Sequence, residues 1–217
     1  MALAANALTL VATAEGDLSI ASGGATALLE RYINTASMAI EAYCQRLFQK
    51  ATRTERVAHS RARRLVLRNT PLVSITSITN DGTAVDTGDY EIEDEAAGLV
   101  LGDSIWVPKD HVVADSLAQD VVPGTGERLL TIVYVGGYVL PNDAGTRNLP
   151  YDIEEACLLT VASLYRARGA DRRIMSEHVG DFSAGFGGVN TAIGRGRGGI
   201  IPDEAFAALR PYRRAPL

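Results

Sequence analysis

The sequence predicts an α+β protein in which helices pack around a hairpin-rich antiparallel β block, followed by an extended Gly/Arg-rich C-terminal arm that ends in a short helix. Apolar residues recur with helical spacing before residue 50 and after residue 150. Between these regions the pattern changes to period two, with turn residues separating short runs. The strands are grouped in one block and do not alternate with helices, so the pattern favours the α+β class.

Two helices are expected before the β block. The first covers Leu8–Glu15 and stops near Gly16, and the second follows Ser22–Gly24 and runs to about Phe48. One helical face of the second carries its apolar residues, which are Leu29, Tyr32, Ile33, Ala36, Ala39, Ile40, Tyr43 and Leu47. This face is therefore expected to form one side of a helical core.

The β block is expected to contain several short strands. Aliphatic and β-branched runs predict strands at 64–67, 72–78, 90–93, 98–101 and 129–135, with a weaker pattern at 104–107. Asn80–Gly82 predicts a hairpin turn, because these residues tolerate the positive φ angles of a type I′ turn. Residues 108–127 are polar and acidic, which indicates a long loop or a projecting hairpin.

Two more helices are expected after the β block. The first follows Pro150, with Asp152 and Glu155 at capping-box spacing, and its apolar residues surround the axis, which predicts burial between other elements. The last is short, begins at Pro202 and stops at Pro211. The expected organisation is a helical core over 1–168 with the β block inserted at about 53–137, then a flexible C-terminal arm and short anchor helix over 169–217.

The arm differs from the rest of the chain in charge. Residues 166–217 hold nine Arg and five acidic residues (9 − 5 = +4), whereas the remainder holds twelve basic and twenty-one acidic residues (12 − 21 = −9). Nine of the 21 Gly lie between 169 and 201, so this stretch is not expected to form a core of its own. A basic arm with an anchor at its tip suggests docking on an acidic protein surface. There are two alternatives. The Arg-Gly run at 194–199 binds nucleic acid, or the arm is a solvated linker.

Two blocks of opposite charge precede the arm. Arg46–Arg68 holds eight basic residues and one Glu, while Asp81–Glu155 holds sixteen acidic and three basic residues. These blocks are either solvated faces or surfaces that pair between neighbouring subunits of a head-to-tail ring, where an acidic channel face would let DNA slide. The candidate inter-subunit or channel-facing charges are Arg61, Arg63, Arg64, Asp89, Glu91, Glu93 and Asp94.

No pattern in the sequence indicates an enzyme. His59, His111 and His178 stand far apart without further metal ligands nearby, and no nucleophile elbow or phosphate loop is present. We therefore expect no catalytic, cofactor-binding or metal-binding residues and no cofactor. Cys44 and Cys157 are expected to be buried free thiols in a reducing compartment, with a disulfide or a metal site as alternatives. The sequence predicts neither a secretory signal nor a membrane span.

Several pieces of the chain, taken in order, resemble one protein family. They are 28–33 and 39–48 of the long helix, 71–78 with the Asp81–Gly82 turn and Tyr90, 132–138 leading to Leu149–Pro150 and the helix ending at Leu164–Tyr165, then 179–183 and 209–214. Together they resemble the head–tail connector, or adaptor, proteins of tailed bacteriophages. The stretch before Gly24, the insertion at 104–127 and the run at 185–199 depart from the family pattern.

The resemblance implies a non-enzymatic virion protein of the phage neck, made in the host cytoplasm. It implies a dodecameric ring beneath the portal that extends the DNA channel and provides the attachment surface for the tail. The implied partners are the portal protein, neighbouring copies, a tail-proximal neck or tail-terminator protein and passing DNA bound without sequence specificity, with no membrane. Another neck or tail-completion ring, or a nucleic-acid-binding module using the arm, is the alternative.

The resemblance also implies which residues meet the portal. The C-terminal part of the family contacts it, and the matching candidates here are Arg195, Arg197, Tyr212, Arg213 and Arg214. Tyr212 would be the buried anchor, and the Arg residues would pair with carboxylates.

Overall fold

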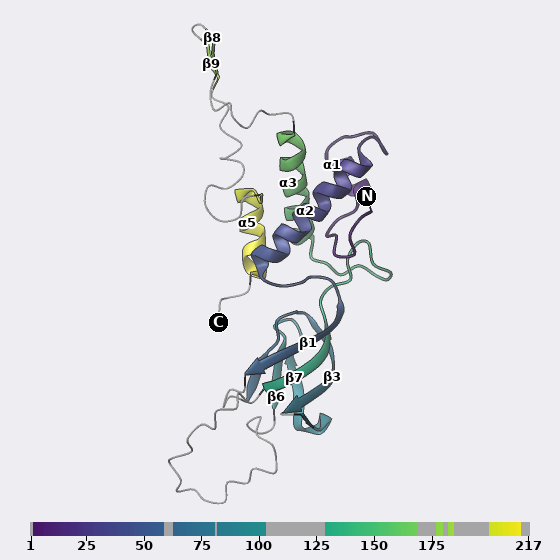
Figure 1. Cartoon of the computed structure of the whole chain (residues 1–217), viewed down its shortest axis with the longest axis vertical. Helices are drawn as coiled ribbons and strands as arrows, with labels where there is room; N and C mark the ends of the chain where they lie inside the picture. The colour runs from purple at the N-terminus through teal and green to yellow at the C-terminus, as the bar shows by residue number, and fades with distance from the viewer. Residues whose placement is uncertain are drawn as a thin grey trace, which may run out of the picture. The chain divides into compact units, whose positions relative to one another are not determined.

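The computed structural model contains two compact units (Figure 1). It describes residues 2–58, 63–80, 82–102, 129–168, 177–179, 182–184 and 200–213. One unit comprises Met1–Gln49 with Val139–Leu217 and is mainly helical, and the other comprises Lys50–Tyr138 and is built from strands. The predicted α+β class is confirmed.

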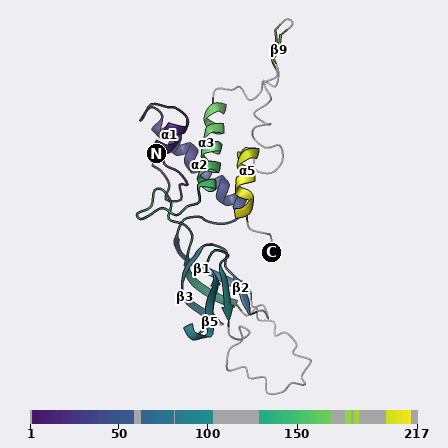
Figure 2. The ribbon, with the colours of Figure 1, turned by 180° about the vertical axis from the view of Figure 1, so that it is seen from behind.

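The helical unit is built from two chain segments, one that precedes the β unit in the sequence and one that follows it. Its elements are α1 (Val11–Asp17), α2 (Thr26–Cys44), α3 (Tyr151–Ala167), α5 (Asp203–Leu209) and the 3₁₀ turn η2 (Arg210–Tyr212). α2 packs against α3, α1 contacts both, and α5 lies along α3 (Figures 1 and 2). The short helix after Pro202 is thus packed on the helices that the sequence predicts as the core.

α2 has the single apolar face that the sequence predicts, but it is shorter than expected. The helix ends at Cys44 because Gln45 adopts a left-handed conformation with φ of 54°, which is a common way to stop a helix. Leu47 therefore leaves the apolar face and is 41% exposed. Phe48 returns to the core, and its backbone N–H donates a hydrogen bond of 3.1 Å to Glu41 Oε1.

The segment before Val11 is not helical, although the sequence predicts a helix from Leu8. α1 begins at Val11, because Ala7, Leu8 and Thr9 are buried against α2 and α3 in non-helical conformation. The Leu8 N–H donates to Ser37 Oγ at 3.1 Å, and Thr9 Oγ1 donates to Glu154 Oε1 at 3.0 Å. The predicted start of this helix at Leu8 was therefore wrong.

α3 is buried on several sides, as predicted, but the predicted capping box is wrong. Pro150 is the residue before the helix and has an extended backbone, so Asp152 already lies in the first turn and no side chain caps the helix. The neighbouring Glu154 is buried. Besides Thr9, it binds Arg147 through an ion pair of 2.6 Å between Nη2 and Oε2.

The β unit contains two antiparallel sheets. Strands β1 (Ala51–Ala58), β7 (Leu129–Gly136), β3 (Leu72–Asn80) and β4 (Thr83–Ala84) form the first in that order, and β2 (Arg64–Val66), β6 (Leu99–Gly102) and β5 (Tyr90–Asp94) form the second. The turn η1 (Thr87–Asp89) precedes β5. The predicted hairpin turn is present, since Asn80 pairs with Thr83 and Gly82 has φ of 84°. The expected features at 104–107 and 108–127 lie outside the described residues.

The two sheets enclose one hydrophobic core. Its buried residues are Leu65, Leu67, Leu72, Ile78, Val100, Leu130, Ile132 and Tyr134. Within the arm, β8 (Glu177–Val179) pairs with β9 (Phe182–Ala184). The arm was expected to be flexible. Apart from 177–179, 182–184 and 200–213, its residues lie outside the described part of the chain.

Candidate interface surfaces

Two of the five candidate portal contacts lie in the described part of the chain. Tyr212 closes η2 and Arg213 follows it directly, whereas Arg195, Arg197 and Arg214 lie outside the described residues. Tyr212 is half-buried, and its hydroxyl forms a long hydrogen bond of 3.5 Å with Asp152 Oδ2 of α3. Arg213 is exposed to solvent.

The helix before these residues holds them on the helical unit. Ala205 and Leu209 of α5 have no solvent exposure, and the Phe206 ring meets the Tyr43 ring of α2 edge-on with centroids 4.7 Å apart. The Arg213 guanidinium lies over the same Tyr43 ring, 5.3 Å from its centroid. The sequence places this helix at the tip of an arm, and the structure places it in the apolar core of its own unit.

A second arginine, which is not among the predicted portal contacts, lies at this end of the unit. Arg46 follows the end of α2 and stacks over the Phe48 ring at 5.2 Å. Burial raises the pKa of the Cys44 thiol to about 11, although Arg46 and Arg213 both act to lower it. Both guanidinium groups therefore lie near Cys44, although the two arginines come from distant parts of the chain. Cys44 and Cys157 are both buried and free, as expected.

The charged candidates of the β unit lie on two strands of the three-stranded sheet. Arg64 is on β2 and Glu91, Glu93 and Asp94 are on β5, while Arg63 precedes β2, Asp89 ends η1, and Arg61 lies outside the described residues. Arg64 binds Glu93 in a two-pronged ion pair, with Nη2 to Oε1 at 2.8 Å and Nε to Oε2 at 3.1 Å. Two candidates of opposite charge therefore meet within one subunit.

The remaining charged candidates have local partners or face solvent. Arg63 Nε donates to the Gly102 carbonyl at 3.1 Å, and Asp94 Oδ1 accepts from the Ala97 N–H at 3.0 Å. Glu91 is exposed on the same strand as Glu93. β2 and β5 are the two outer strands of their sheet, so the basic and acidic candidates come from opposite edges, although the Arg64 and Glu93 side chains meet across the middle strand β6.

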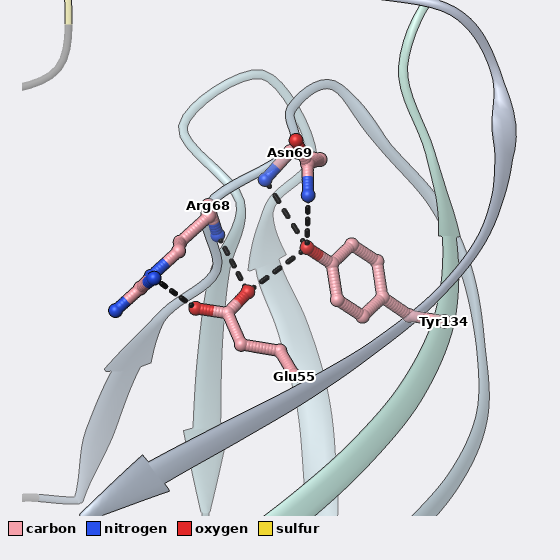
Figure 3. Close-up of polar contacts among 4 residues, drawn as sticks. All are labelled: Glu55, Arg68, Asn69 and Tyr134. Carbon is pink, nitrogen blue, oxygen red and sulfur yellow. Dashed lines mark hydrogen bonds and ion pairs between the residues drawn. The ribbon is translucent and has the colours of Figure 1, made fainter. Parts of the chain in front are cut away.

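A buried polar cluster in the β unit is absent from the sequence predictions (Figure 3). Glu55 of β1 accepts hydrogen bonds from the Tyr134 hydroxyl at 3.0 Å and from the Arg68 N–H at 2.9 Å, and its other oxygen lies 3.1 Å from Arg68 Nε. The Tyr134 hydroxyl in turn accepts from the Asn69 N–H at 3.1 Å. One signal was available, because Glu55 is the only acid in the basic block Arg46–Arg68.

The cluster fixes a loop and offers no reactive group to solvent. Burial raises the pKa of the Tyr134 phenol, and the neighbouring Glu55 carboxylate raises it further, so the phenol keeps its proton near neutral pH. Gly136 supports the same contact, because a Cβ there would overlap the Asn69 carbonyl oxygen. The segment from Arg68 to Pro71 is therefore held against β1 and β7.

The described residues show neither a group of metal ligands nor a membrane-spanning helix. In the described ranges, no three His, Cys, Asp or Glu side chains are grouped to hold a metal ion. No helix of the described chain is long and apolar enough to cross a membrane.

Solved structures with a similar fold include chains from gene transfer agent particles. The chain superposes on a chain from the neck of an empty gene transfer agent particle computed with C6 symmetry, with a TM-score of 0.57 and 16% identity, covering 100% of this chain and 95% of that one. A chain from the neck of the native particle computed with C12 symmetry gives 0.55 and 18%, with 100% and 94% covered. A chain from the virion of the native particle gives 0.56 and 16%, again with 100% and 94% covered.

At these identities the likeness establishes a shared fold. It confirms, at the level of the fold, the resemblance to head–tail connector proteins stated above. No family model matches the sequence, and no curated protein matches it.

Proposed function

We propose that this protein is a structural component of the neck of a tailed bacteriophage or a phage-like particle. The observation that carries this proposal is the likeness of fold, over the full chain, to chains from the neck and virion of gene transfer agent particles. The order of sequence pieces that resembles the connector family supports the same role independently of the fold.

In the proposed role, copies of the chain form a ring beneath the portal, extend the DNA channel and provide the attachment surface for the tail. The C12 symmetry of one similar neck supports a ring of twelve copies. The other proposed partners are a tail-proximal neck or tail-terminator protein and genomic DNA that passes without sequence-specific binding. The protein would be made in the host cytoplasm and reside in the virion neck.

We assign the portal contact to the C-terminal part of the chain. Arg213 is exposed, and its position over Tyr43 fixes the guanidinium plane. A guanidinium stacked on a ring still offers N–H groups at its edge to a carboxylate. Acidic side chains of the portal protein are therefore the proposed partners of Arg213, with Tyr212 beside it. Arg195, Arg197 and Arg214 remain candidate portal contacts because of the resemblance to the connector family, whose C-terminal part contacts the portal.

A charge reversal at Arg213 tests the portal contact. Deleting the C-terminal helix would not, because Ala205 and Leu209 belong to the core. We expect Arg213→Glu to weaken co-sedimentation with purified portal rings at least about tenfold, since like charges would then face each other. Arg31→Glu is the matched control, because Arg31 also lies 5.3 Å from a tyrosine centroid, that of Tyr32, and should bind like wild type.

The same experiment separates the neck roles. Wild-type protein that binds purified tails but not portals would identify a tail-completion ring and reject the portal assignment. Wild-type protein that binds neither portals nor tailless heads would reject the neck role altogether. If wild type and Arg213→Glu bind portals equally, the role stands and Arg213 is not the contact.

A further inference from the structure

The three-stranded sheet of the β unit has one basic edge and one acidic edge. Arg63 and Arg64 lie at β2, and Glu91, Glu93 and Asp94 lie on β5, with β6 between them. Among the strands that the structure describes, none pairs with the outer side of β2 or of β5. A strand edge without a pairing strand is a template for strand addition. Opposite charges on the two edges of one sheet would favour addition of a second copy in head-to-tail order.

The side-chain alternation of the two edges is compatible with such an addition. In register across the sheet, Leu65, Val100 and Ile92 form a row on the core side, while Arg64, Leu101 and Glu91 form the adjacent row on the outer side. A neighbouring β5 placed beside β2 would extend both rows. Apolar side chains would then meet apolar ones, and Glu would lie beside Arg.

Strand direction is also compatible with a ring. β2 and β5 both run antiparallel to β6, so they are parallel to each other. Neighbours in a twelvefold ring differ by one twelfth of a turn, which changes the direction of a strand only slightly. The β5 strand of the next copy would therefore arrive nearly parallel to β2, with a rotation similar to the natural twist of about 20–25° between adjacent strands.

We propose that neighbouring copies join through these edges, with the acidic β5 edge of one copy placed beside the basic β2 edge of the next. This inference rests on the proposed ring function and names the surface that would build the ring. The internal Arg64–Glu93 pair does not prevent the contact. The Arg64 side chain is 64% exposed, so the pair contributes little to stability, and its remaining N–H groups can bind a second carboxylate. Val66, 54% exposed on β2, would be covered by the neighbour.

A different explanation assigns these charges a protective role. Charged side chains on outer strands commonly prevent sheets from associating edge to edge. The two explanations make opposite predictions for charge reversal. Under the protective explanation, replacing one charge by its opposite leaves assembly unchanged. Under the proposal it places like charges at every interface of the ring.

The decisive experiment uses two complementary charge reversals. Arg63→Glu and Glu91→Arg each produce like charges at every contact between identical copies, so each alone should need at least about tenfold more protein to fill portal rings, measured by native mass spectrometry. An equal mixture should recover wild-type assembly, because each variant's edge then meets the opposite charge on the other. Recovery by mixing cannot arise from a contact within one subunit.

Arg56→Glu on β1 is the matched control, because it reverses an exposed charge of the same unit on the other sheet and should assemble like wild type. Circular dichroism of each variant confirms that it is folded. Single variants that assemble like wild type, or a mixture that fails to recover, would overturn the edge contact while leaving the neck role intact. Failure of the wild type and the control to load portals would instead overturn the proposed function, and the edge contact with it.

Discussion

At the scale of single residues, the hydroxyl of Tyr134 is a buried polar group of the β unit with a partner on each side. It donates to Glu55 and accepts from the Asn69 N–H, and its side chain has no solvent exposure. We expect Tyr134→Phe to lower the free energy of unfolding by about 1–3 kcal/mol, because the buried Glu55 carboxylate and the half-buried Asn69 N–H both lose their hydrogen bond to the hydroxyl. Urea denaturation followed by circular dichroism measures the change. Tyr151→Phe is the control, since Tyr151 is 78% exposed and should change stability by less than about 0.5 kcal/mol.

The buried acids show which residue contacts the sequence could not predict. Glu55 binds Tyr134, 79 positions away, and Glu154 binds Thr9, 145 positions away. The basic block around Glu55 hints at a charged partner, but no local pattern marks either glutamate as buried, because acidic residues are usually exposed and depend on a partner for burial. Exposed candidates such as Arg64 and Glu93 could be named from charge alone, but their pairing within one sheet required the strand register.

At the scale of elements, α5 is a short helix that the helical unit holds through two buried residues. Ala205 and Leu209 are completely buried, and α5 packs along α3. We expect Leu209→Ala to destabilise the helical unit by about 2 kcal/mol or more and to increase amide exchange in α5 and α3. Met38→Ala is the matched control, because Met38 is 66% exposed on α2 and should have almost no effect. Unchanged exchange in α5 of the Leu209 variant would contradict this packing.

The sequence predicted elements where the hydrophobic period was strong. α3, β3, β5, β6 and β7 were predicted close to their bounds from their apolar patterns, and α2 was predicted close to its start but four residues too long. β1 was missed because its sequence, Ala-Thr-Arg-Thr-Glu-Arg-Val-Ala, has polar side chains on both faces. Its inner face holds Glu55, which is buried by the polar cluster and not by hydrophobicity. The packing of α5 was also beyond the local pattern, since its partner Tyr43 lies far away in the chain.

At the scale of the whole molecule, the chain enters and leaves the β unit at one point. The Lys50 N–H donates to the Tyr138 carbonyl at 2.7 Å, and the residues between them enclose their own hydrophobic core. We expect a fragment spanning residues 50–138 to fold alone, with the dispersed amide spectrum of an ordered β protein in nuclear magnetic resonance. A fragment of residues 1–49 should remain unfolded, because the partners of α2 lie beyond residue 138. A disordered 50–138 fragment would contradict the independence of this unit.

Because the β unit lies between the two segments of the helical unit in the sequence, the two units can fold one after the other during translation. Translation supplies the whole β unit before α3 and α5 exist, so the inserted unit can reach its native state while the surrounding one still lacks its later half. The α2 face can pack against α3 once that helix has emerged, whereas Tyr43 gains its partner Phe206 only after α5 has left the ribosome. Maturation of each newly made polypeptide thus proceeds from the middle outward.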